Sequence, residues 1–165
     1  MTPGASGGNL GLGIAKGKAA TKCQKAITAA GLAFAQSLDK GLQKCADTVF
    51  RCAQGDPTGL AACLAKAQPK CAQETGKLQG AEAKFRKAVA AACGPTAVSP
   101  TDLLDRLGVG YGGHAARCKT FGVPALTSLG QVVECLVREH SCRARQLLDE
   151  QMPRARELLR LGGVP

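Results

Sequence analysis

The stretch that decides the fold is residues 45–71, CADTVFRCAQGDPTGLAACLAKAQPKC. It places two cysteines on each side of a turn at residues 55–59, and Cys23 and Cys93 lie farther out on either side. When the six are paired outward from the turn, as 52 with 63, 45 with 71 and 23 with 93, the residue numbers of each pair add to 115 or 116. Residues at the same height in two antiparallel helices have a constant number sum, because each helix rises about 1.5 Å per residue. The spacing therefore predicts an antiparallel pair of helices cross-linked by three nested disulfides.

Apolar residues recur at helical spacing on both sides of the turn, as expected for two helices that pack together. The first stripe contains Cys23, Ile27, Phe34, Leu38, Leu42, Cys45, Val49 and Cys52. The second contains Leu60, Leu64, Ala67, Cys71, Leu78, Phe85, Ala88 and Ala92. Because disulfides hold Cα atoms about 4.4–6.8 Å apart, we expect Gly31 and Gly41 to allow a close approach of the partner helix.

We predict an all-α fold: a long antiparallel αα-hairpin with three nested disulfides, and a smaller C-terminal helical lobe packed on it. Residues 1–12 form a flexible N-terminal segment, 13–94 the hairpin and 95–165 the lobe of the same domain. The hairpin helices are expected over about 14–53 and 58–93, with a kink or restart at Pro69. The lobe is expected to contain short helices after Ser99 and Tyr111, a longer one from Thr127 or Ser128 to Gln151, and a last one to Leu161.

Composition indicates a small core and an oxidising compartment. Only 3% of the residues are aromatic and none is Trp, whereas nine are Cys. Disulfides are the usual support for such a chain, and they form in secreted or periplasmic proteins. The first eight residues have no features of a signal peptide, so we expect one to have been removed. No run of 18 apolar residues occurs, so no transmembrane segment is predicted.

The segments Cys23-Gln24-Lys25-Ala26-Ile27 and Gln43-Lys44-Cys45 resemble uncharacterised secreted, Cys-, Ala- and Lys-rich helical proteins of bacteria. The resemblance covers mainly the hairpin and implies its helical architecture and export. No activity is known for that group, so the resemblance implies none here.

Three cysteines remain once the hairpin is paired, and they allow one further bridge. Cys135 and Cys142 lie about 10.5 Å apart along one predicted helix, which is too far for a disulfide. An extended segment 119–127 would reach far enough to pair Cys118 with Cys142, and this pairing is our prediction, with Cys135 as the free thiol. The alternative is Cys118 with Cys135. An inert buried thiol or a disulfide-linked homodimer is favoured over a reactive thiolate, although Arg138 and His140 are near in sequence.

His114 and His140 are the two histidines of the chain, and they are weak candidates for a metal or haem site. The chain has no C-x-x-C-H, H-E-x-x-H or phosphate-binding loop, which are motifs that would carry such chemistry. We therefore expect no cofactor and no resident metal, and a non-catalytic protein rather than an enzyme. A thiol or haem enzyme using Cys135, His114 and His140 is the second alternative.

Basic residues are concentrated in the predicted hairpin. The whole chain has a formal charge of +10, and residues 1–93 contain 13 Lys or Arg against 5 Asp or Glu. Lysines on the second helix fall within about 100° of arc beside its apolar stripe, and they are Lys66, Lys70, Lys77, Lys84 and Lys87. The first helix adds further basic residues on its outward side, namely Lys22, Lys25, Lys40, Lys44 and Arg51.

Such a lysine-rich helix is typical either of a hydrated surface or of a binding face for an anionic polymer or anionic surface. No aromatic residues alternate with the lysines, so base stacking and sequence-specific nucleic-acid binding are not expected. We predict an exported binding or structural protein that associates with such a partner as a monomer or homodimer.

The first alternative is a carrier of an apolar small molecule between hairpin and lobe. Its candidate lining, which would otherwise form a second core, is Leu32, Phe50, Leu103, Leu104, Leu107, Val132, Leu136, Leu147, Leu158 and Leu159.

Overall fold

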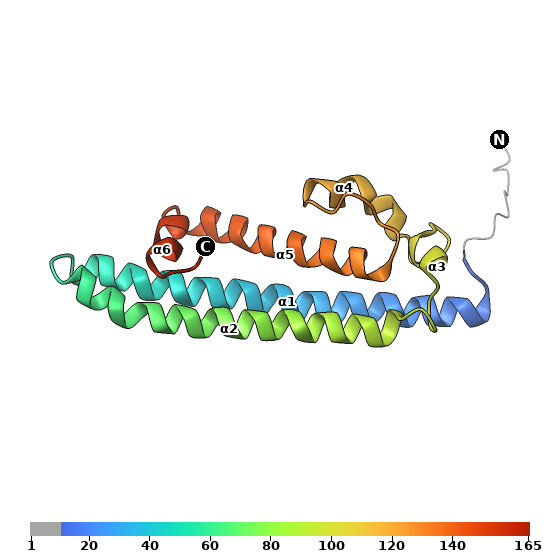
Figure 1. The fold of residues 1–165 in the computed structure, drawn as a ribbon, viewed down its shortest axis with the longest axis horizontal. Helices are drawn as coiled ribbons and strands as arrows, with labels where there is room; N and C mark the ends of the chain where they lie inside the picture. Colours follow the sequence, from blue (N-terminus) through green and yellow to red (C-terminus); the bar gives the residue numbers. More distant parts are fainter. Residues whose placement is uncertain (1–10) are drawn as a thin grey trace, which may run out of the picture. The chain divides into compact units, whose positions relative to one another are not determined.

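Two long helices dominate the computed structural model, which describes residues 11–165 (Figure 1). They are α1 (Ile14–Gly55) and α2 (Leu60–Cys93). The smaller elements are α3 (Pro100–Leu104), the 3₁₀ helix η1 (Tyr111–His114), α4 (Ala115–Thr120), α5 (Leu129–Gln151) and α6 (Ala155–Leu161). No strand occurs in this described range. The predicted all-α fold, a long hairpin followed by a smaller C-terminal helical region, is confirmed. A flexible segment was predicted for residues 1–12, and residues 1–10 of it lie outside the described range.

Asp56 organises the turn between α1 and α2. Its carboxylate accepts hydrogen bonds from the backbone N–H of Gly59 at 2.7 Å and from the Thr58 hydroxyl at 3.3 Å. A Cβ atom on Gly59 would overlap that carboxylate. A side chain at position 59 would therefore displace the Asp56 carboxylate from these hydrogen bonds, and α2 begins at Leu60, immediately after the glycine.

The three nested disulfides of the hairpin are confirmed. Their Cα–Cα distances are 4.7 Å for Cys23–Cys93, 4.8 Å for Cys45–Cys71 and 5.6 Å for Cys52–Cys63. These distances require a close approach of the two backbones. Gly41 contributes to it, because a Cβ there would lie 2.8 Å from Cδ2 of Leu78 on α2.

The apolar stripe predicted for α1 is buried along its whole length. On α2 the prediction holds less well: Ala88 is exposed and its neighbour Val89 is fully buried instead. Pro69 does not divide α2, since the helix is continuous through it. Both Pro69 and Ala65, whose carbonyl the proline leaves without a helical donor, are exposed, so water can satisfy that carbonyl.

Contacts divide the chain into two compact units whose boundary falls within α1, α2 and α5. The first unit contains Ala88–Cys135 with the described part of Met1–Thr28, and the second contains Ala29–Lys87 with Leu136–Pro165. This division differs from the sequence boundaries 13–94 and 95–165, because each unit combines hairpin residues with residues that follow the hairpin.

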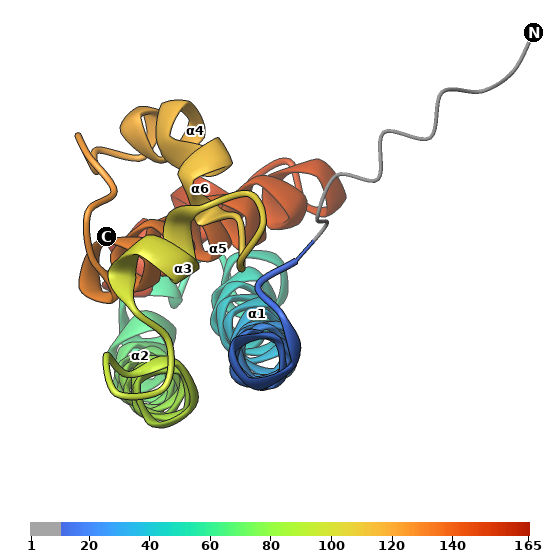
Figure 2. The same cartoon turned by 90° about the vertical axis from the view of Figure 1, so that its right-hand side faces the viewer.

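In the first unit, α3 lies near the beginning of α1 and the end of α2 (Figure 2). Ser99 caps α3 by accepting a hydrogen bond from the backbone N–H of Asp102 at 3.1 Å. Lys16 on α1 forms an ion pair with the Asp102 carboxylate at 3.1 Å. The hydrogen bond from the Ser99 hydroxyl and, next, the contact with Lys16 lower the pKa of Asp102.

Tyr111 is the single tyrosine of the chain and is 8% exposed. Burial raises the pKa of its phenol, and a hydrogen bond with Gln24 opposes this effect. The unfolded chain ionises near pH 10, whereas the folded chain keeps the phenol protonated to higher pH. We therefore expect stability to be unaffected by this group below about pH 10 and to fall as the pH rises above it.

Ultraviolet absorbance of tyrosinate measures this titration directly, because only one phenol contributes. The midpoint should be higher in the native protein than in denaturant, and Tyr111→Phe should reduce the alkaline loss of stability. Equal midpoints in the two states would contradict the buried position of Tyr111.

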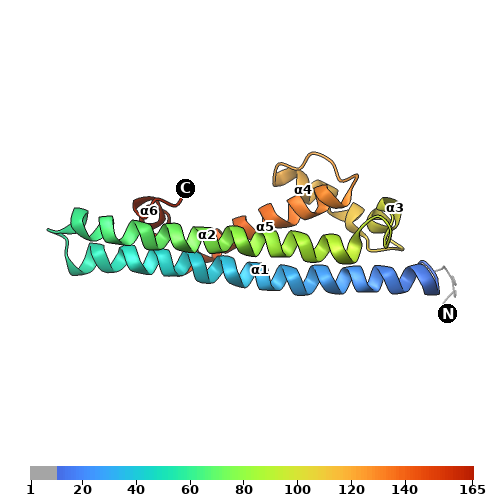
Figure 3. The same cartoon turned by 60° about the horizontal axis from the view of Figure 1, so that its bottom comes forward.

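In the second unit, α1 and α2 lie side by side (Figure 3), and residues after the hairpin cover one side of them. The rings of Phe34 and Phe85 stack with centroids 5.7 Å apart, and His140 of α5 meets both rings edge-on. Gly31 leaves room for this imidazole, because a Cβ there would lie 3.2 Å from its Nε2.

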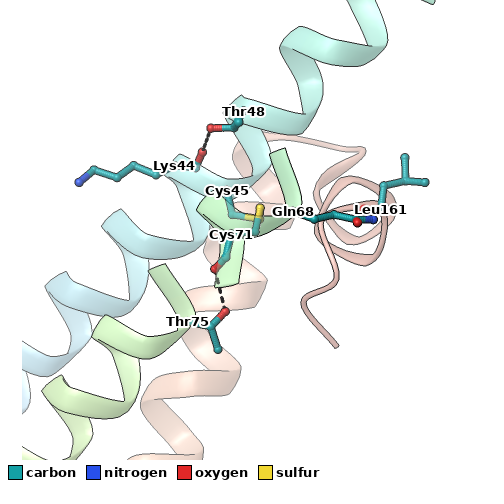
Figure 4. Close-up of a disulfide and its surroundings, with 7 residues drawn as sticks. All are labelled: Lys44, Cys45, Thr48, Gln68, Cys71, Thr75 and Leu161. Carbon is teal, nitrogen blue, oxygen red and sulfur yellow. Dashed lines mark hydrogen bonds between the residues drawn. A yellow bond between two sulfur atoms is a disulfide. The ribbon is translucent and has the colours of Figure 1, made fainter. Parts of the chain in front are cut away.

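The residues after α6 pack on the Cys45–Cys71 disulfide. A Cβ on Gly162 would lie 2.7 Å from Sγ of Cys71 and 2.8 Å from Sγ of Cys45. The Gln68 side chain donates a hydrogen bond to the Leu161 carbonyl at 3.1 Å (Figure 4). This side of the hairpin is therefore covered within the second unit.

Candidate anion-binding face

We define the lysine face as five exposed side chains on α2, all within the second unit: Lys66, Lys70, Lys77, Lys84 and Lys87. Helical geometry places them within about 100° of arc and over about 30 Å of helix length. Ala67, Cys71 and Phe85 are buried on the neighbouring stripe. The packing of that stripe on α1 therefore directs the lysines outward.

Few carboxylates neutralise the lysine face. Lys77 forms an ion pair with Glu74 at 2.7 Å, and the hydrogen bond from Lys77 lowers the pKa of Glu74, with Lys44 contributing as a nearby charge. Glu82 pairs instead with Arg86 at 2.7 Å. The other four lysines of the face make no ion pair within residues 11–165.

The basic residues of α1 divide between the two units. Lys22 and Lys25 belong to the first unit, and Lys40, Lys44 and Arg51 to the second. Lys44 and Arg51 border hollows that Lys70 of α2 also lines. Helical periodicity predicted that both side chains lie on the outward side of α1. It did not indicate that they lie close to Lys70 of the lysine face.

The predicted Cys118–Cys142 bridge with Cys135 free is wrong. Cys118 pairs with Cys135 at a Cα–Cα distance of 5.3 Å, and the free, exposed cysteine is Cys142. The alternative pairing considered from the sequence is the one that forms. Cys142 thus replaces Cys135 as the thiol available for alkylation or an intermolecular disulfide.

A turn directly after α4 explains this pairing. Gly122 adopts a positive φ of 78°, and the backbone N–H groups of Phe121 and Val123 both donate to the Cys118 carbonyl. The chain therefore reverses at once instead of extending along α5. Val123 packs with Cys118 and Cys135 in one buried cluster, and Cys142 lies about 10.5 Å farther along α5.

The residues proposed for thiol or haem chemistry are divided between the two units. Cys135 is bonded to Cys118, so it supplies no thiol. His114 is exposed beside Tyr111 in the first unit, and His140 packs on Phe34 and Phe85 in the second. Among the described residues, no group of three or more His, Cys, Asp and Glu is placed to hold a metal ion.

The apolar residues considered for a carrier site have varied surroundings. Leu103, Val132, Leu158 and Leu159 are buried in the cores of their units. Three others are among the exposed large apolar side chains, with exposed fractions of 61% for Leu32, 38% for Phe50 and 44% for Leu147. The burial of these residues does not test whether an apolar molecule binds, so the carrier function stays a prediction.

None of the helices in the described range has an apolar stretch long enough to cross a membrane. Comparison with known protein families, curated proteins and solved structures gave no match to this chain. A function must therefore be inferred from the chemistry of the surfaces described above.

Proposed function

We propose that the protein is an exported, non-catalytic binding or structural protein that associates with an anionic polymer or surface through the lysine face of α2. The observation that carries this proposal is the set of four exposed lysines on one side of α2 that have no ion-pair partner within residues 11–165. Four disulfides are compatible with an extracellular or periplasmic location.

The expected physical basis is counterion release. A polyanion carries condensed cations, and each lysine that replaces one of them adds to the salt dependence of binding. Five such contacts would give a slope of log K against log salt of roughly −3.5, with the coefficient measured for single-stranded polyanions. We therefore expect affinity for heparin to fall about 100-fold between 50 and 200 mM salt.

The lysine face itself is tested with a variant in which Lys70, Lys84 and Lys87 are changed to Gln. Glutamine has nearly the helix propensity of lysine, so the fold should be retained. We expect the variant to bind heparin at least about tenfold more weakly and with a shallower salt slope. Isothermal calorimetry over a salt series measures both quantities.

A charge-matched control replaces Lys18, Lys22 and Lys25, which lie on α1 in the first unit. This control should bind nearly as tightly as the unchanged protein. Equal losses in the two variants would show that net charge alone drives binding, and absent or salt-insensitive binding by the unchanged protein would refute the proposal.

A further inference from the structure

Two adjoining hollows of about 300 and 320 Å³ lie between α1 and α2, beside the Cys45–Cys71 and Cys52–Cys63 disulfides. Thr48, Arg51 and Lys70 line both of them, so the two hollows are neighbours, and together we call them the basic groove. All of its lining residues belong to the second unit. The two disulfides hold the walls of the groove at a fixed separation.

Cations come from both walls of the basic groove. Lys44 and Arg51 stand on α1, and Lys66 and Lys70 on α2. None of the four makes an ion pair within the described part of the chain. Arg51 uses its Nε to donate to the Asp47 backbone carbonyl at 3.4 Å, which leaves the terminal nitrogens of its guanidinium for a ligand.

Two carboxylates also border the groove, and they limit its charge without cancelling it. Asp47 and Glu74 line the hollow nearer the Cys45–Cys71 bridge. Glu74 is held by Lys77 at 2.7 Å, so one of the two negative charges already has a partner outside the groove. Four cations thus face two carboxylates, and an anionic ligand is favoured.

The groove lies on the side of the hairpin that α6 does not cover. In Figure 4 the Lys44 side chain is directed away from the segment that contains Leu161, whereas Gln68 is directed toward it. Packing of Gly162 on the two sulfurs occupies that other side. The Cys45–Cys71 disulfide is therefore covered on one side by the residues around Gly162 and bordered on the other side by the basic groove.

We infer that the basic groove binds a single chain of an acidic polysaccharide. This inference rests on the proposed function and specifies its ligand and its site. Cations on two opposed walls suit a narrow linear chain that lies between them. Thr48 and Gln73 add a hydroxyl and an amide to the lining. The Thr48 hydroxyl donates to the Lys44 carbonyl at 2.7 Å, so it can accept a hydrogen bond from a sugar hydroxyl, and the Gln73 amide can both donate and accept.

Other polyanions fit the groove less well. Its lining contains no aromatic side chain and no large apolar side chain, so it offers neither stacking for bases nor apolar groups for a bilayer. Helices that pack in contact have axes about 8–10 Å apart, which leaves a groove too narrow for a nucleic-acid duplex.

The test uses the α1 wall, because Lys44 and Arg51 are not part of the lysine face. With both changed to Gln, affinity for heparin in calorimetry should fall about tenfold, and the slope of log K against log salt should become shallower by roughly 1.4. The matched control changes Lys22 and Lys25 of the same helix and should lose less than about twofold. Circular dichroism confirms that both variants fold.

The outcomes separate this inference from the proposed function. If the lysine-face variant binds heparin weakly while the Lys44 and Arg51 variant binds like the unchanged protein, the groove is refuted and the proposed function stands. Binding to duplex DNA or to phosphatidylglycerol vesicles in preference to heparin and polygalacturonate would overturn the choice of a polysaccharide. If none of these probes binds the unchanged protein, both proposals fail.

Discussion

Loss of the Cys23–Cys93 disulfide, with both cysteines changed to Ala, is expected to lower the free energy of unfolding by roughly 3–4 kcal/mol. This bridge joins residues 70 apart in sequence and is the cross-link of the hairpin in the first unit. The inner bridges shorten the loop that it closes, but the entropy depends only on the logarithm of loop length. Thermal unfolding should show a midpoint lower by roughly 10 °C.

The control for this variant is Cys142→Ser, which removes the exposed free cysteine and no bridge. It should unfold within about 0.5 kcal/mol of the unchanged protein. An unchanged midpoint after loss of Cys23 and Cys93 would mean that the outer bridge does not restrain the unfolded chain.

Gly162→Ala is the second change with a large expected effect, a loss of about 1–3 kcal/mol. The new methyl group would lie 2.7 and 2.8 Å from the sulfurs of the Cys45–Cys71 bridge and 3.2 Å from Val49. A disulfide between two packed helices cannot move aside as a flexible side chain does, so the residues after α6 must shift. Chemical denaturation measures the loss.

Gly80→Ala on α2 provides the matched control. No atom of a neighbouring segment lies within 4 Å of the position that a methyl group would take at this exposed residue, and alanine favours a helix over glycine by roughly 0.5–1 kcal/mol. The same chemical change should therefore stabilise the protein at position 80 and destabilise it at 162. Stabilisation at both positions would contradict the packing of Gly162 on the disulfide.

The hairpin was predictable from sequence because two independent patterns agree on it. The mirrored positions of Cys23, Cys45 and Cys52 and of their partners specify a register, and the apolar stripe on α1 points to the same face. Few alternative folds satisfy both. The stripe on α2 was less accurate, because it included Ala88, which is exposed. The constant number sum of 116 places Val89 opposite Ile27, and both of these residues are buried.

The prediction of the last bridge was wrong because it considered only how far residues 119–127 can extend. It did not consider that Gly122 favours a turn. A nine-residue segment can extend to Cys142, but Gly122 readily adopts a positive φ, and the Cys118 carbonyl accepts hydrogen bonds from the residues on either side of that glycine. The signal was the Phe121-Gly122 pair directly after a short helix. It indicates reversal of the chain and therefore the nearer partner, Cys135.

The lysines of α2 could be identified from helical periodicity, but the basic groove could not. Whether the α1 wall is left uncovered depends on which side of the hairpin the residues around Gly162 pack against. Tertiary packing determines that side, and helical periodicity does not indicate it. Lys44 and Arg51 consequently looked like ordinary outward charges. The structure adds them to Lys66 and Lys70 by placing all four beside the same two disulfides.

Peptide mapping under non-reducing conditions tests most directly the arrangement on which both the hairpin and the basic groove depend. The expected map links Cys23 to Cys93, Cys45 to Cys71, Cys52 to Cys63 and Cys118 to Cys135, and an alkylating reagent labels Cys142 alone. A map in which Cys45 or Cys52 is joined to any other partner would contradict the account, because the two walls of the groove would then not face each other.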